Sequence, residues 1–168
     1  MEPREAKRDI KILRVAGRLH RVVPILDTAG KVIQYAVSPL KVELRKRDVM
    51  QILVGSGALA VPVAFTEETW QLGATLPISN VMILAAMSVV FVAAYVYYNF
   101  YRELLQQHVF SYVKRVLAIY LLSLLVVAAL LSVIGQAPWG QDWLLALNRT
   151  IIVGFPASMT AAVSDAID

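Results

Sequence analysis

The run VLAIYLLSLLVVAALLSVI, residues 116–134, decides the fold class of this chain. It carries no formal charge and no polar face, so a helix built from it has no side to present to water. A helix needs about 20 mostly apolar residues to cross a hydrocarbon core of about 30 Å. The run therefore predicts a transmembrane helix, and a soluble protein with very hydrophobic core helices is the disfavoured alternative.

Apolar stretches on either side of this run predict an all-α membrane protein with four transmembrane helices. The fourth helix needs Asn148 and Arg149 to lie in the outer part of the membrane. The first and fourth are rich in small residues and each contains a proline, so we expect them to form the protein-facing interior while the other two face lipid. The predicted spans are about 48–66, 78–99, 115–135 and 143–164.

The charges of the chain are concentrated before the first span. The 168 residues are 58% hydrophobic and 17% charged, whereas a soluble domain is about 25% charged. Residues 1–48 hold 18 of the 28 Asp, Glu, Lys and Arg residues. We therefore predict two domains, a small cytoplasmic head over 1–47 and a four-helix transmembrane domain over 48–168. With no cysteine, disulfides and thiolate metal sites are excluded.

The distribution of Lys and Arg predicts the orientation. The head carries 12 of the 16 basic residues, and the link between the second and third spans holds Arg102, Lys114 and Arg115. The links on the opposite face hold only Arg149. By the positive-inside rule, both termini are expected in the cytoplasm of a multi-pass plasma-membrane protein.

The head is predicted to contain a basic amphipathic helix followed by a β-hairpin. Residues 4–19 place apolar side chains on one helical face and Lys7, Lys11, Arg14 and Arg18 on another, a pattern typical of helices that bind anionic lipid at a membrane surface. Packing against another helix of an assembly explains the pattern equally well. Apolar runs over 21–26 and 31–37, separated by turn-forming residues, predict the hairpin.

Nucleic acid is not an expected partner of the basic head. Tyr35 is the only aromatic residue before the first span, so no aromatic platform is interleaved with the basic residues. The expected partners are the lipid bilayer and further copies of the chain.

Two adjacent carboxylates, Glu67 and Glu68, follow the first span where no basic residue comes until Arg102. Water, a bound cation, or Arg149 near the same outer depth could compensate them. Carboxylate oxygens favour hard cations such as calcium or magnesium, the only metal or cofactor expected. The predicted cation-binding or pore residues are Glu67, Glu68, Thr66, Ser56 and Gly57, with Asn99 and Asp165 as secondary polar candidates.

Two parts of the sequence resemble a known family. They are the run 57–70, which contains Pro62 and the Thr-Glu-Glu-x-Trp cluster Thr66 to Trp70, and the ending Pro156-Ala157-Ser158 through Asp165. It is an uncharacterised family of archaeal and bacterial four-helix integral membrane proteins, catalogued as a domain of unknown function. The resemblance covers all four spans. It implies a prokaryotic membrane protein and no particular activity.

Two functions fit these features. The first is a homo-oligomeric cation channel or transporter, in which the first span lines the pathway and Glu67 and Glu68 form an acidic outer mouth. The second is a membrane-anchored assembly or regulatory module, in which pairing of Glu67 or Glu68 with Arg149 is structural. An enzyme is not expected, because no nucleophile, base and orienting group converge in the sequence.

Overall fold

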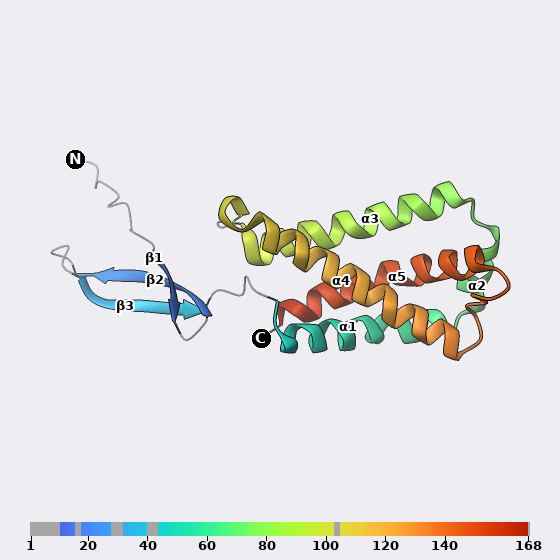
Figure 1. Cartoon of the computed structure of the whole chain (residues 1–168), viewed down its shortest axis with the longest axis horizontal. Helices are drawn as coiled ribbons and strands as arrows, with labels where there is room; N and C mark the ends of the chain where they lie inside the picture. Colours follow the sequence, from blue (N-terminus) through green and yellow to red (C-terminus); the bar gives the residue numbers. More distant parts are fainter. Residues whose placement is uncertain (1–10, 16–17, 28–31, 40–43, 103–104, 168) are drawn as a thin grey trace. The chain divides into compact units, whose positions relative to one another are not determined.

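The computed structural model describes residues 11–15, 18–27, 32–39, 44–102 and 105–167 (Figure 1). The chain divides into two compact units, Met1–Glu43 and Leu44–Asp168. Each unit is described separately below.

The first unit contains a three-stranded antiparallel sheet in the order β1-β2-β3. Its strands are β1 (Lys11–Val15), β2 (Arg18–Leu26) and β3 (Val32–Pro39). The predicted hairpin is confirmed by the pairing of β2 with β3. Pro24 lies on the central strand β2, yet the described pairing with β1 ends at Val22, so the missing N–H of Pro24 breaks no described bond to β1.

The predicted amphipathic helix over 4–19 is wrong for the described residues. Lys11 and Arg14 lie on β1 and Arg18 begins β2. A helix places residues three and four apart on one face, whereas a strand alternates successive residues between its two faces, so the single basic face of the predicted helix is not formed over the described residues. The remaining predicted lipid-binding residue, Lys7, lies outside the described residues.

The second unit is helical, as predicted. Figure 1 shows its long helices running side by side, with a short helix across one end of the bundle. The elements are α1 (Lys46–Ala64), α2 (Glu67–Thr75), α3 (Ile78–Val96), the π-helix η1 (Tyr97–Tyr101), α4 (Leu105–Val133) and α5 (Trp143–Ala166).

Three segments of this unit are long and apolar enough to cross a membrane alone: Ile78–Tyr101, His108–Val133 and Trp143–Ala166. The first predicted span is a bent pair, because α1 ends at Ala64 and α2 leaves it at 86°. The described chain therefore has three candidate spans, or four if the pair counts as one. We call the end of the bundle with Lys46 and Ala166 the inner end, and the end with α2 the outer end.

The last helix, α5, is the centre of the bundle. It contacts α1, α2, α3 and α4. Of the three long apolar segments it has the largest buried share, 50%, against 22% for the segment that starts with α3 and 28% for the one in α4. The prediction that the last span faces protein is confirmed, and the middle two are the more exposed segments, whose contact with lipid stays a prediction.

Small residues let the helices approach α5 closely. A Cβ on Gly55 of α1 would lie 2.4 Å from the Ser164 Cβ, and one on Gly154 of α5 would lie 2.4 Å from the Leu124 Cδ2 of α4. The contact at Gly55 is too close for a side chain and therefore depends on glycine, whereas the Leu124 methyl beside Gly154 is the end of a side chain that can move. The predicted packing face of the first span is thereby confirmed.

Candidate functional site

The break between α1 and α2 is built by the Thr-Glu-Glu-x-Trp cluster. Thr66 donates through its hydroxyl to the Val63 carbonyl at 2.8 Å, and its oxygen lies 2.7 Å from the Thr69 hydroxyl. Trp70 donates from Nε1 to the Ala64 carbonyl at 2.7 Å. Carbonyls at a helix end lack partners within their own helix, so these side chains supply bonds that the bend would otherwise leave unmade.

Glu67 and Glu68 occupy the first turn of α2, and both are exposed. A carboxylate is stabilised there by the positive end of the helix dipole. Glu67 accepts a hydrogen bond from the Gln71 side chain at 3.1 Å. No described Lys or Arg forms an ion pair with either glutamate, so both carboxylates face the surroundings at the outer end.

The predicted pairing of these glutamates with Arg149 is not present. Arg149 donates from Nε to the Trp70 carbonyl at 3.2 Å and from Nη1 to the backbone and side-chain oxygens of Gln136 at 2.8 and 3.0 Å. A Cβ on Gly73 would lie 2.4 Å from the Arg149 Cγ, so α2 packs directly on this side chain. Arg149 thus joins α5 to α2 and to the turn after α4, and its position beneath α2 gives it backbone acceptors instead of the glutamates.

The predicted pore residues of α1 do not share one environment. Ser56 is fully buried and donates to the Ile52 carbonyl of its own helix, so it faces the bundle and not a pathway between copies. Gly57 is half-buried, with open space where a Cβ would be. Thr66 is exposed at the bend beside the glutamates. Ser56 is buried because the small-residue face of α1 packs against α5.

A different face of α1 is exposed along the length of the helix. Most of its side chains are apolar, and the exposed fractions are 61% for Met50, 69% for Val54, 48% for Val61 and 57% for Phe65. Spacings of three, four and seven residues keep them on one side of a helix. We call this set the outward column of α1; it comprises Arg47, Met50, Val54, Val61 and Phe65.

The inner end holds a buried ion cluster that joins three helices. Arg115 of α4 and Asp165 of α5 are both fully buried side chains, paired from Nε to Oδ2 at 2.7 Å and from Nη2 to Oδ1 at 3.0 Å. The same Nη2 lies 3.4 Å from Oδ2 of Asp48 in the first turn of α1. A bidentate pair with a second carboxylate is the arrangement that makes a buried guanidinium tolerable.

Aromatic rings complete the surroundings of this cluster. The Arg115 guanidinium lies 4.0 Å from the centre of the Phe100 ring, which allows a cation–π interaction. Tyr101 is fully buried nearby and makes an edge-to-face contact with Tyr112 at 5.4 Å. Both Phe100 and Tyr101 belong to the π-helix η1, whose wider turn changes the direction of side chains at the end of α3.

Of the two secondary polar candidates, only Asp165 enters this cluster. Asn99 is exposed and donates to the Tyr95 carbonyl one turn earlier. Sequence reasoning missed Asp48 and Arg115, since both belong to basic or mixed flanks that look like topology signals. Arg115 directly precedes the long apolar run, so a helix that contains this run places Arg115 at the edge of the membrane; this position could have indicated a buried charge.

No group of three His, Cys, Asp or Glu side chains among the described residues could hold a metal ion. Glu67 and Glu68 of a single chain form no such group.

The family described as "Putative integral membrane protein (DUF2391)" matches residues 12–167. No curated protein and no solved structure matches the chain significantly.

Proposed function

We propose that this chain, which belongs to the DUF2391 family of integral membrane proteins, is one subunit of a homo-oligomeric cation channel or transporter. The chain is a membrane protein by family and by its long apolar helices. The proposal adds that the bent pair α1–α2 is the first of four spans and that the inner end faces the cytoplasm. It assigns the chain no catalytic activity.

The outward column of α1 is the observation that carries this proposal. It runs from Arg47 at the inner end through apolar residues to Phe65, just before the exposed Glu67 and Glu68. Several copies around an axis, with α1 innermost, would enclose a basic inner mouth, an apolar constriction and an acidic outer ring. Apolar constrictions gate by dewetting, and acidic rings concentrate cations.

Oligomerisation also supplies what one chain lacks for cation binding. A single protomer offers two neighbouring glutamates, whereas a ring of copies brings one pair from each subunit to the axis. Calcium takes six to eight oxygen ligands, and magnesium keeps several of its waters. We therefore propose calcium or magnesium as the cation held at Glu67 and Glu68.

Flux measurements in proteoliposomes test this function. Purified chain should carry calcium, magnesium, sodium or potassium faster than empty liposomes do, and Glu67→Gln with Glu68→Gln should lower divalent flux about ten-fold or more, the loss expected when an acidic ring is neutralised. Asp142→Asn is the matched control, because Asp142 is an exposed outer acid that caps α5, and asparagine is an equally good cap. Flux equal to that of empty liposomes for all four cations would exclude the channel.

A second candidate is a membrane-anchored assembly or regulatory module. The apolar side chains of the small sheet favour it: Ile33, Tyr35 and Val37 of β3 are exposed by 67%, 59% and 55% within the described residues. A three-stranded sheet gains stability when such side chains are covered. In this case no cation would cross faster than in empty liposomes, and the double glutamine variant would leave that result unchanged.

A further inference from the structure

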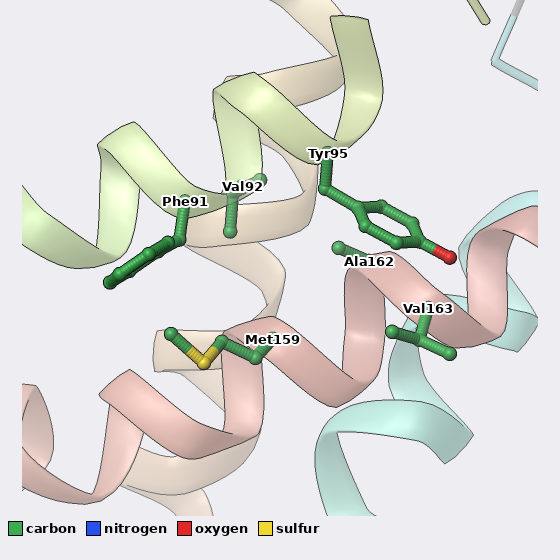
Figure 2. Close-up of a pocket in the computed structure, with 6 residues that line it drawn as sticks. All are labelled: Phe91, Val92, Tyr95, Met159, Ala162 and Val163. Atoms are coloured by element: carbon green, nitrogen blue, oxygen red, sulfur yellow. The ribbon is translucent and has the colours of Figure 1, made fainter. Parts of the chain in front are cut away.

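An apolar groove opens between α3 and α5 in the inner half of the bundle. It has a volume of about 240 Å³, and Figure 2 shows its walls contributed by both helices. Phe91 and Val163 are exposed by 47% and 44%, so the groove is open to the surroundings of the bundle. The lining residues are Phe91, Val92, Tyr95, Met159, Ala162 and Val163.

The groove has a closed end and a polar end. Toward the outer end, Ser88 and Ser158 share a hydrogen bond of 2.6 Å, and the rings of Phe91 and Phe155 meet edge to face at 6.1 Å. These contacts bring α3 and α5 together. At the other end, the Tyr95 hydroxyl points away from Phe91 (Figure 2). The groove therefore runs from its closed end toward its polar end, which lies nearer the inner end of the bundle.

A basic surface lies beyond the polar end of the groove. Tyr95, Tyr98 and Arg102 follow one another at spacings of three and four residues, and the Arg102 guanidinium lies 5.4 Å from the centre of the Tyr98 ring. Arg102 is exposed and forms no ion pair with a described residue. The described acids at the inner end, Asp48 and Asp165, are held by Arg115, while Lys46, Arg47 and Lys114 are exposed.

The distance from the closed end of the groove to Arg102 matches the thickness of one leaflet. Phe91 and Arg102 are eleven residues apart, which is about 16 Å along a helix at 1.5 Å per residue. One leaflet contributes about 15 Å to a hydrocarbon core of about 30 Å. A lipid whose phosphate lies at Arg102 would thus place the end of an acyl chain at the closed end.

We propose that this groove binds an anionic phospholipid of the leaflet at the inner end, with one acyl chain between α3 and α5 and its headgroup phosphate at Arg102. Arg102 contributes charge attraction, the Tyr95 and Tyr98 rings lie at the interface, and the groove contributes apolar contact. Basic pockets between transmembrane helices are suited to such headgroups. The site is separate from the outward column of α1 and from Glu67 and Glu68.

Native mass spectrometry of the full chain in detergent, titrated with phosphatidylglycerol or phosphatidylcholine, tests the site. The unmodified chain should retain phosphatidylglycerol more strongly. Arg102→Gln should lower that retention about five-fold, which corresponds to the 1 kcal/mol expected for one basic residue near a lipid surface. Val163→Trp, which fills the groove from an exposed wall position, should lower retention of both lipids.

Two control variants separate the groove from the general surface. Lys114→Gln removes another exposed inner cation, and Val90→Trp adds a ring at a lipid-facing position of α3 that is exposed by 64%. Neither should change retention. The proposal would be overturned by equal retention of the two lipids or by an equal loss of retention in the control variants. A change of oligomeric state in Val163→Trp without loss of lipid would also overturn it and would assign the groove to a second copy of the chain. Lipid retention is measured without any cation flux, so the lipid-binding result can be interpreted even if the channel proposal fails.

Discussion

A guanidinium inside a membrane bundle has lost its hydration, so its N–H groups need acceptors from the protein. Arg115 finds them on Asp165 and Asp48, which lie on the last and first helices of the bundle. Asp165 also needs Arg115, because a carboxylate near the C-terminal end of a helix is disfavoured by the helix dipole. Burial of Asp165 therefore depends on Arg115, and Arg115 makes its bidentate pair with Asp165.

Removing one partner of this pair should be more damaging than removing both. We expect Arg115→Gln or Asp165→Asn to lower the free energy of unfolding in mixed micelles by about 3–5 kcal/mol, since the first takes the guanidinium from buried Asp165 and the second takes the bidentate carboxylate from buried Arg115. The double variant Arg115→Met with Asp165→Leu should recover most of the loss. Arg102→Gln, at an exposed cation, should change stability little. Single effects that simply add in the double variant would contradict the coupling.

At the scale of elements, the contact of α1 with α5 depends on the glycine-rich face of α1. The two glycines of this helix differ sharply, because a Cβ on Gly55 would lie 2.9 Å from the Thr160 carbonyl oxygen as well as against Ser164, whereas Gly57 has open space. A backbone atom cannot move aside as the end of a side chain can. The contact at Gly55 therefore fixes the distance between the two helices.

Alanine substitution at these two glycines makes a matched pair. Gly55→Ala should lower the free energy of unfolding by about 1–3 kcal/mol through overpacking. Gly57→Ala should be neutral or stabilising by up to about 1 kcal/mol, because alanine is the better helix former. Chemical denaturation of both variants in the same micelles measures the difference. Equal stability of the two would show that the helices do not approach at Gly55.

Long apolar runs made the helices of the bundle predictable, because a hydrocarbon solvent imposes length and composition on any segment that crosses it. The break after Ala64 could not be predicted in the same way, because it is accompanied by a bond from Trp70 to the Ala64 carbonyl that hydrophobicity does not indicate. The residues near Lys11 carry a weak helical pattern that strand pairing overrides. Arg115 was missed because its partners lie 50 and 67 residues away, and local periodicity carries no information on such pairs.

At the scale of the whole molecule, the inner end brings the two ends of the helical unit together. Gln51 near the start of α1 donates to the Ile167 carbonyl after α5 at 2.7 Å, and Asp48 and Asp165 share Arg115. If α1 and α2 form one bent span, both ends of the unit lie on one side of the membrane. A pair that enters and leaves from the outer side would place the start of α1 away from the end of α5, so it is incompatible with these contacts.

The absence of cysteine allows this to be measured directly. Single variants Lys46→Cys, Gln71→Cys and Ala166→Cys should be treated with a membrane-impermeant maleimide on intact cells. We expect only Gln71→Cys to react, with the other two reacting after lysis, because both termini are proposed to be cytoplasmic. Reaction of Lys46→Cys together with Gln71→Cys on intact cells would instead establish three spans and a re-entrant pair.

The central position of α5 has a consequence for how the protein is made. Synthesis proceeds from the N-terminus, so the helix that contacts all the others leaves the ribosome last. Until then α1, α3 and α4 lack their common partner, and Arg115 is in the membrane without Asp165. Nascent chains that stop before Trp143 should therefore be targets for membrane quality control, and the arrival of α5 is the step that converts inserted helices into a folded bundle.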